Sequence, residues 1–257
     1  MDLVALPAFS DNYIWMLHDH AQAWVVDPGD AAPVRAALDA RGLRLAGILV
    51  THHHPDHVDG IDALRALLGR SGQVHGPARE RIPEPFVPHA DGDMLDVLGE
   101  RFEVIDVPGH TAGHVAYLQH DATAPLLFCG DTLFSAGCGR VFEGTPAQMA
   151  ASLARMAALP RATRVCCAHE YTLANLRFAA AVEPENEALA AHRAHCEELR
   201  AADAPTLPST MALELEINPF LRCRTPAVVA AARSQGARGN DAVSVFTALR
   251  EWKNRFR

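Results

Sequence analysis

The ten residues THHHPDHVDG, at positions 51–60, constrain the fold more than any other stretch of the chain. They place four histidines and two aspartates directly after the apolar run LAGILV, at positions 45–50. A short apolar run of this kind is typical of a buried β-strand, and functional side chains are often held on the loop that follows one. A solvated turn needs only one or two such polar residues. The segment therefore predicts a strand end that presents imidazole and carboxylate groups to a metal ion.

The spacing within this segment favours convergence of its side chains. Alternate side chains of an extended segment share a face, so His52, His54 and Asp56 are expected to point the same way. His57 would lie beside them as a helix begins at about Val58.

Three more apolar runs end in a potential ligand with glycine or another small residue nearby. DVPGHTAGH supplies His110, LLFCGDTLF supplies Asp131 and RVCCAHEYT supplies His169. With the first segment this gives five histidines and two aspartates, which exceeds the three protein ligands of a typical catalytic zinc. Two metal ions are therefore predicted, with Asp131 as a candidate to bridge them. Imidazole and carboxylate ligands suit zinc and also iron or manganese.

The order of the apolar runs predicts an α/β (α+β) protein whose sheets are not purely parallel. Met94–Leu98 followed by Phe102–Val107 is expected to form a hairpin, whereas other strands are separated by the helical patterns 33–40, 58–68 and 146–159. Thr145, Pro146 and Gln148 form a helix-start signature. The predicted strands lie in the runs NYIWML, AWVVDPGD, LAGILVT, RFEVIDVPGH, HVAYL, LLFCGD and RVCCAH.

The last third of the chain has a different texture and predicts a small helical domain. Residues 172–203 are rich in Ala, Leu, Glu and Arg, and helical periodicity returns at 225–234 and 241–256. Thr225 and Asp241 are candidate N-caps. Residues 204–220 are the one long segment that we expect to be irregular.

Charge and cysteine usage narrow the class of protein. The formal net charge of −8 disfavours a general nucleic-acid or membrane-surface binder. The first residues lack the pattern of a secretory signal, and no apolar stretch is long enough to span a bilayer. The six cysteines show no CxxC spacing, which favours reduced thiols. We therefore expect a cytoplasmic protein with neither a nucleic-acid nor a membrane partner.

Taken together, the motifs THxHxDHxDG, GHTxGH, GDTLF and CAHEYT resemble those of the metallo-β-lactamase superfamily. The stretches PAFSDNYIWML, LFCGDTLFSAGCGRVFEGT, CCAHEYTLAN and LREWKNRF are similar, more narrowly, to glyoxalase II, the hydroxyacylglutathione hydrolases. The resemblance covers the whole chain. It implies an αββα sandwich over residues 1–172 as the catalytic domain and a helical, substrate-binding domain over residues 173–257.

The resemblance also implies how the ligands are shared. One metal would be held by His52, His54 and His110, and the other by Asp56, His57 and His169, with Asp131 and a water shared between them. Asp56 and Asp131 would thus have catalytic roles, because a water activated by two metals is the expected nucleophile. His53 lies at a variable position of the motif, and His114 is interpreted as a partner of the ligands rather than as a ligand.

The substrate implied by the resemblance is a glutathione thioester. Arg250 and Lys253 lie on one face of the last predicted helix, a pattern that on its own is also typical of a solvated helix end. In glyoxalase II the matching residues bind glutathione together with those that match Arg140 and Tyr171. Phe142 stands where some members carry Tyr, and Arg140 where others carry Lys. The expected reaction is hydrolysis of S-(2-hydroxyacyl)glutathione, chiefly S-D-lactoylglutathione, to D-lactate and glutathione. This reaction would complete methylglyoxal detoxification. We expect the protein to act as a monomer.

Three other functions are compatible with parts of this pattern. A persulfide dioxygenase with a single iron would not need Asp56 and His169 as ligands of a second site. A β-lactamase or lactonase would not need the set Arg140, Tyr171, Arg250 and Lys253. A metal-binding protein without catalysis would tolerate a degenerate ligand, and none of the seven positions is degenerate.

Overall fold

The computed structural model describes residues 1–256, with the side chain of residue 70 left out. The chain forms two compact units, each drawn from separate stretches of sequence. The first unit contains residues 1–106, 112–130 and 166–169, and the second contains residues 107–111, 131–165 and the chain from Glu170 onward. The predicted boundary after residue 172 stays a prediction.

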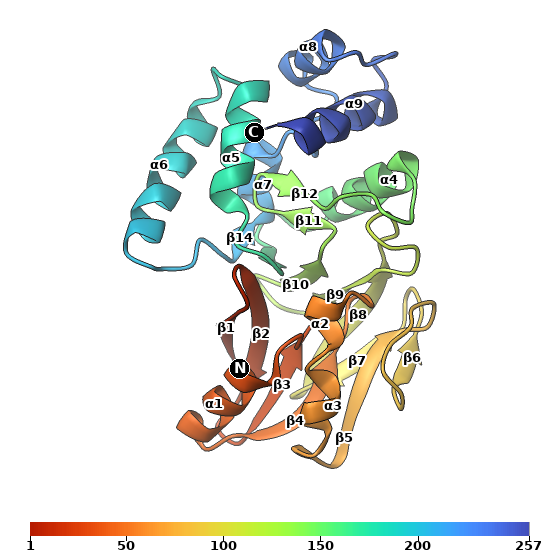
Figure 1. Cartoon of the computed structure of the whole chain (residues 1–257), viewed down its shortest axis with the longest axis vertical. Helices are drawn as coiled ribbons and strands as arrows, with labels where there is room; N and C mark the ends of the chain where they lie inside the picture. Colours follow the sequence, from red (N-terminus) through yellow and green to blue (C-terminus); the bar gives the residue numbers. More distant parts are fainter. Residues whose placement is uncertain (257) are drawn as a thin grey trace. The chain divides into compact units, whose positions relative to one another are not determined.

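The first unit contains a six-stranded mixed sheet (Figure 1). Its first three strands are antiparallel neighbours and the next three run parallel. Parallel neighbours need crossover connections, which here include helices. In sheet order the strands are β1 (Asp2–Ala8), β2 (Asn12–His18), β3 (Gln22–Val26), β4 (Arg44–Leu49), β5 (Leu68–Pro77) and β6 (Val87–His89), and the helices are α1 (Ala31–Arg41), α2 (Pro55–Val58) and α3 (Ile61–Arg65).

Helices α1 and α3 pack against this sheet and close its core. Val34 and Leu64 are fully buried in one cluster with Ile14 and Ile48 of the strands. Helix α1 begins where the Asp30 carboxylate accepts a hydrogen bond from the Ala32 amide, and such a cap satisfies an amide that the helix itself leaves unpaired. This packing fixes the end of β4, where the histidine-rich segment starts.

The second sheet carries the predicted hairpin. Strands β7 and β8 pair antiparallel, which confirms the hairpin expected at Met94–Leu98 and Phe102–Val107. Within the first unit, the Tyr117 hydroxyl donates to the Val50 carbonyl at 2.7 Å and links the two sheets. The order of strands is β14 (Ser209–Thr210), β13 (Arg164–Cys167), β10 (Leu126–Gly130), β9 (Val115–Gln119), β8 (Glu100–Asp106) and β7 (Met94–Val97).

The second unit is mostly helical, and its helices after Tyr171 agree with the small helical domain that the change in texture predicts. It also includes a two-stranded hairpin that the sequence patterns did not predict. Its small core contains Leu176, Leu189 and Ile217. The predicted start of α4 is confirmed, because Thr145 and Gln148 form a capping box with Pro at the first turn. The elements are β11 (Leu133–Phe134), β12 (Gly137–Cys138), α4 (Pro146–Ala157), α5 (Thr172–Val182), α6 (Glu187–Ala201), α7 (Met211–Ile217), α8 (Pro226–Ser234) and α9 (Ala242–Arg255).

The prediction of one helix over residues 58–68 is wrong. Helix α2 begins earlier, at Pro55, and ends at Val58, and a separate helix, α3, begins after Gly60. The Gly60 amide donates to the Pro28 carbonyl at 3.1 Å, and a Cβ at Gly60 would lie 2.4 Å from that oxygen. This close approach divides the helix, while Leu68 already belongs to β5.

The prediction of an irregular segment over residues 204–220 is also wrong. It contains β14 and α7, and α7 begins where Thr210 accepts a hydrogen bond from the Leu213 amide. Glu214 of α7 is fully buried, so the alternation of Leu and Glu in this segment does not divide buried from exposed positions. Strands β1, β5 and β6 are additional elements that the sequence patterns did not predict.

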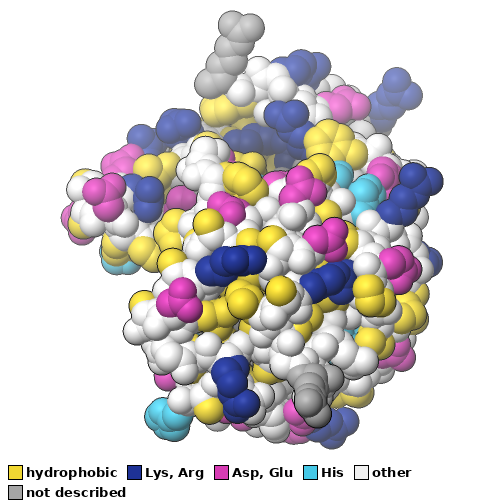
Figure 2. All heavy atoms as spheres, turned by 60° about the horizontal axis from the view of Figure 1, so that its bottom comes forward, with side chains coloured by type: hydrophobic (Ala, Val, Ile, Leu, Met, Phe, Trp, Pro, Cys, Tyr) yellow, Lys and Arg dark blue, Asp and Glu magenta, His cyan; other side chains and the backbone are white. Residues whose placement is uncertain are grey.

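The character of the helices and the distribution of charge on one face both bear on possible partners. Among the described residues, none of the helices combines the length and apolar character that a bilayer crossing requires. On the face shown in Figure 2, basic and acidic side chains are interspersed among hydrophobic ones.

Candidate active site

The histidine-rich segment begins with a buried carboxylate that fixes its first turn. Asp27, only 5% exposed, accepts hydrogen bonds from the Thr51 amide and hydroxyl, both at 2.7 Å. Its Oδ2 also lies 3.1 Å from Nδ1 of His57. Asp27 therefore orients a predicted ligand from a different strand end.

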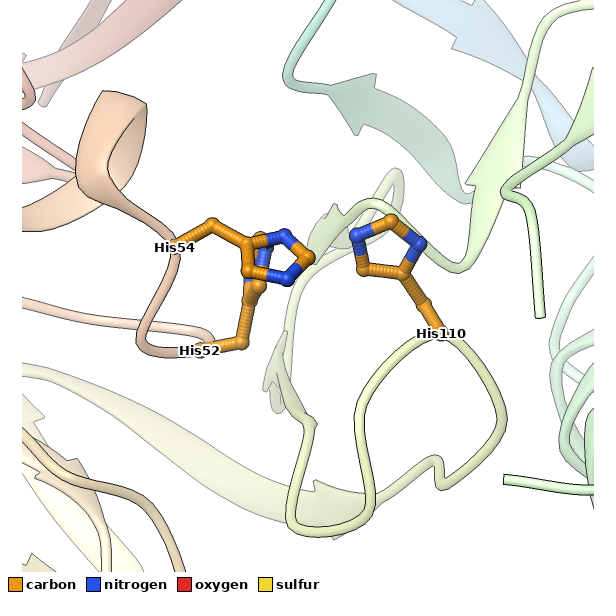
Figure 3. Close-up of side chains that lie close together, drawn as sticks. All are labelled: His52, His54 and His110. Atoms are coloured by element: carbon orange, nitrogen blue, oxygen red, sulfur yellow. Dashed lines mark hydrogen bonds between the residues drawn. The ribbon is translucent and has the colours of Figure 1, made fainter. Parts of the chain in front are cut away.

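His52 and His54 lie next to each other at the end of β4. Nε2 of His52 is 3.1 Å from Nδ1 of His54, and the two rings are edge to face (Figure 3). His52 is fully buried and stacks on His114, with ring centroids 4.6 Å apart. The contact agrees with the interpretation of His114 as a partner that orients a predicted ligand.

A second group of predicted ligands forms within the same unit. Oδ2 of Asp56 lies 3.5 Å from Nε2 of His57 and 3.4 Å from Nε2 of His169. The three residues offer one carboxylate oxygen and two imidazole nitrogens, all within 4.8 Å of one another. Spacing of this kind suits the coordination of one divalent cation.

The hairpin between β1 and β2 holds this second group. Oδ1 of Asp11 is 2.9 Å from Nδ1 of His169, and Nδ2 of Asn12 donates to Oδ2 of Asp56 at 2.9 Å. Sequence reasoning noted the segment PAFSDNY only as a family likeness and assigned neither residue a role. The signal that was available is the rule that a metal-ligating histidine donates a hydrogen bond from its second ring N–H to a carboxylate or a carbonyl oxygen.

Glu80 supports the ligand-bearing loop and was also missed. Its carboxylate accepts a hydrogen bond from the His53 amide at 3.2 Å, contacts the His53 ring, and accepts from the Gly113 amide at 2.7 Å. The Glu80 side chain is 1% exposed. A Cβ on Gly113 would lie 2.8 Å from both the Arg79 carbonyl oxygen and Oε1 of Glu80, so glycine at this position of GHTAGH makes room for the backbone and for the carboxylate.

The second unit contributes His110 and Asp131. Nε2 of His110 lies 3.4 Å from Oδ2 of Asp131, and both residues are buried. Nδ1 of His110 is 2.9 Å from the carbonyl oxygen of Arg140. Because a carbonyl only accepts, Nδ1 carries the proton and Nε2 presents its lone pair. Figure 3 draws His110 on the loop that follows β8.

The same arrangement recurs at most of the predicted histidine ligands. In each case Nδ1 faces an acceptor from its own unit, which directs the lone pair of Nε2 toward the other ligands. The pairs are His52 with the Thr51 hydroxyl, His57 with Asp27, His110 with the Arg140 carbonyl and His169 with Asp11.

The five predicted substrate-binding residues line one cavity in the second unit. The cavity has a volume of about 520 Å³, and His110 and Asp131 also line it. Two aromatic side chains among its lining residues, Phe142 and Tyr171, are 60% and 38% exposed. The predicted set lining it is Arg140, Phe142, Tyr171, Arg250 and Lys253.

The two cations of α9 are held in different ways. Arg250 is 7% exposed, donates to the Cys138 carbonyl at 2.8 Å and lies over the ring of Phe220. Nζ of Lys253 donates to the Ala174 carbonyl at 2.9 Å. Burial is the main cause that lowers the pKa of Lys253 to about 8, and the charge of Arg250 contributes to the same shift. Both cations therefore lie where an anionic ligand would find them partly desolvated.

The comparisons with known proteins cover the chain from end to end. The family described as Metallo-beta-lactamase superfamily matches residues 9–169, and that described as Hydroxyacylglutathione hydrolase C-terminus matches residues 170–256. A hydroxyacylglutathione hydrolase from Albidiferax ferrireducens is 61% identical over 257 residues and covers 100% of both chains. The chain belongs to the hydroxyacylglutathione hydrolase family. The resemblance drawn from the motifs is thereby confirmed.

Solved structures support the fold of this hydroxyacylglutathione hydrolase family member. ETHE1 from Myxococcus xanthus aligns with a TM-score of 0.64 at 26% identity, covering 88% of this chain and 86% of that one. TTHA1623 in a di-iron-bound form aligns with a TM-score of 0.59 at 26% identity, covering 86% of this chain and 100% of that one. The predicted metallo-β-lactamase fold with a helical C-terminal part is confirmed. The fold and the ligand groups together indicate a site for two divalent metal ions.

Proposed function

We propose that the chain hydrolyses S-(2-hydroxyacyl)glutathione thioesters, with S-D-lactoylglutathione as the chief substrate, to D-lactate and glutathione. The observation that carries this proposal is the cavity of the second unit. It combines the predicted ligands His110 and Asp131 with three cations, Arg140, Arg250 and Lys253. A cavity of this kind suits an anionic tripeptide whose reactive carbonyl lies near metal ligands.

We propose the following ligand set for the two metals. His52, His54 and His110 would hold one ion, and Asp56, His57 and His169 the other, with Asp131 shared. The donors fit divalent cations, because the oriented Nε2 atoms and the carboxylates offer ligands that zinc, iron and manganese all accept. Zinc is the proposed occupant. When bound, such ions lower the pKa of water toward neutrality and polarise a carbonyl.

The residues of the chain have separate tasks in this reaction. The cations of the cavity bind the glutathione carboxylates and place the thioester near Asp131 and His110. Phe142 and Tyr171 supply apolar surface that excludes water from the bound thioester. The leaving thiolate resembles that of a free cysteine, whose thiol has a pKa of about 8.5, so it departs without a strong general acid.

We also propose that residues 1–172 act as the catalytic domain and residues 173–257 as the substrate-binding domain. The junction of the two matched families between residues 169 and 170 supports this division. A cytoplasmic location and a monomeric state complete the proposal. The location is supported by six cysteines that all carry free thiols, and the ligand set, drawn from one chain, is compatible with a monomer.

The experiment that tests the function measures hydrolysis of S-D-lactoylglutathione by purified protein whose metal content has been determined. We expect metal-dependent release of glutathione. If protein with about two metals per chain releases none, the proposed substrate is wrong. Oxygen uptake with glutathione persulfide, and hydrolysis of lactams and lactones, would then identify the alternative.

A further inference from the structure

Lys253 is the single lysine of the chain. Of the 23 Lys and Arg residues, all the others are arginines. An arginine guanidinium stays protonated at any physiological pH, whereas a lysine amine becomes a nucleophile once it loses its proton. The chain therefore has one side-chain amine that an acyl donor could modify.

This amine lies in the cavity that the proposed function assigns to the glutathione thioester. Lys253 of α9 lines the cavity with Asp131 and Arg140. Its Nζ lies 5.2 Å from the ring centre of Phe178 and donates to the carbonyl of Ala174, and both of these residues are on α5. These contacts hold Nζ in place instead of leaving it at the end of a freely rotating side chain.

The charged surroundings favour the neutral amine. Burial is the largest cause that lowers the pKa of Lys253 to about 8, Arg250 of α9 and Arg177 of α5 act in the same direction, and Cys138 of β12 opposes them. Arg140 adds another positive charge to the same cavity. With a pKa of about 8, roughly half of the amines are neutral at pH 8, against less than about 1% for a solvent-exposed lysine with its ordinary pKa.

We propose that Nζ of Lys253 is an acylation site, at which an acyl thioester that enters the cavity transfers its acyl group to the amine. The inference rests on the proposed function, because the donor is the substrate of that reaction. The nitrogen forms a bond to the thioester carbonyl carbon, and the carbon–sulfur bond breaks with its electron pair on sulfur. The proton lost from nitrogen ends on the thiolate, so the products are an amide and glutathione, without oxidant or reductant.

The cavity favours this reaction by raising the local concentration of thioester around one fixed amine. A glutathione carboxylate paired with Lys253 would keep the amine protonated, so free glutathione is expected to protect it. The acylating thioester must therefore bind in a second orientation, with its carboxylates on Arg140 and Arg250 and its carbonyl toward Nζ. Acylation removes the charge and two of the three N–H donors. Substrate affinity then falls, and KM is expected to rise by about tenfold. The modification would slow the enzyme when its thioester substrate accumulates.

The test incubates metal-loaded protein with S-D-lactoylglutathione, replenished as it is hydrolysed, and locates the acyl groups by intact mass and peptide mapping. The N-terminal amine of Met1 is the internal reference, because Met1 is 47% exposed and belongs to the other unit. We expect Lys253 to be acylated about tenfold faster than this amine. The rate should rise from pH 7 to pH 9 and fall with added glutathione. Equal rates at the two amines would overturn the inference.

A simple thioester with the same acyl group, at matched concentration, separates binding in the cavity from general reactivity. We expect it to acylate the two amines at similar rates. Hydrolysis is recorded in the same samples. If hydrolysis proceeds while Lys253 stays unmodified, the acylation inference alone fails. If no thioester is hydrolysed, the proposed function fails, and the ratio of the two amines still decides the acylation.

Two variants at this position complete the test. Lys253→Arg keeps the cation and removes the acylatable amine, so KM should not drift during incubation relative to its own starting value. Lys253→Gln imitates the neutral amide, and its KM should match that of fully acylated protein. A drift in Lys253→Arg equal to that of the unmodified sequence would contradict the assignment.

Discussion

The ligand-bearing segments of the first unit and the cavity of the second unit are built in different ways. In the first unit, all predicted ligands except His169 lie within positions 52–57, and the carboxylates of Asp11 and Asp27 lie beside His169 and His57. In the second unit, Arg140 lines one cavity together with Arg250 and Lys253, two neighbours on α9 that lie far from it in sequence. The difference suggests a division of labour, in which the predicted metal ligands, including His110 and Asp131 of the cavity, determine the rate of the chemical step and the cations of the cavity determine substrate affinity.

Removal of metal should give the largest effect. Treatment with a chelator is expected to lower kcat for S-D-lactoylglutathione by about 10³-fold or more, because an uncatalysed water is a far weaker nucleophile. The fold should persist, since the apolar core clusters that contain Val34 and Leu176 do not involve the ligands. Hydrolysis and circular dichroism are measured together, and added zinc should restore activity. Full activity in metal-free protein would show that the predicted ligands do not determine the rate through bound metal.

Asp11 should control the metal group of the first unit. Asp11→Ala removes the carboxylate 2.9 Å from Nδ1 of His169, and loss of such a partner typically lowers metal affinity by about 10- to 100-fold. Competition with a chromogenic chelator would measure the loss for one of the two metals. Asp2→Ala, at an exposed position of β1, is the matched control. Equal metal affinities in the two variants would show that Asp11 does not orient His169.

The contact between Glu80 and Gly113 should appear as coupling in the free energy of unfolding. Glu80→Gln turns one acceptor into a donor that faces an amide, which should cost about 1–3 kcal/mol. Gly113→Ala would place a Cβ 2.8 Å from the Glu80 carboxylate. Gly113→Ala also meets the Arg79 carbonyl, but both changes disturb the contact between Gly113 and Glu80, so the double variant should lose less than the sum.

Urea unfolding measures this coupling, and Glu84→Gln at an exposed position serves as the control. Strict additivity of the two changes would indicate that Gly113 and Glu80 act separately.

The pH dependence of KM should give the smallest effect and should be confined to the cavity. Lys253 loses its charge as pH rises through about 8. Affinity for the anionic substrate should therefore be constant below this pH and fall above it, with KM rising several-fold, up to about tenfold. This change should leave kcat unaltered. Lys253→Arg keeps its charge, so its KM should stay flat between pH 7 and pH 9, and an identical rise in both proteins would assign the effect to another group.

The sequence predicted those parts of the site whose geometry is local. His52, His54, Asp56 and His57 lie within six residues, so their short separation was enough to bring them together. Strand alternation was the wrong reason for Asp56, because this residue lies in α2 and groups with His57 and His169. The Thr145 capping box is local in the same way. Each of these features depends on neighbours within one or two turns.

The positioning residues could not be predicted because their partners are distant in sequence. Asp11 and His169 are 158 residues apart, and Glu80 lies 33 residues from Gly113. The broken helix at Gly60 has the same cause, since the space at this glycine is limited by Pro28 of another segment. Tertiary contacts of this kind leave no periodic pattern.

The measurement that tests the division of labour most directly compares kcat and KM for S-D-lactoylglutathione and for a non-glutathione thioester with the same acyl group. It uses the unmodified sequence, Asp131→Ala and Arg140→Ala. We predict that Asp131→Ala lowers kcat for both thioesters, whereas Arg140→Ala raises KM for the glutathione thioester alone. If Arg140→Ala raises KM equally for both substrates, or if the unmodified protein does not prefer the glutathione thioester, the proposed division of labour is wrong.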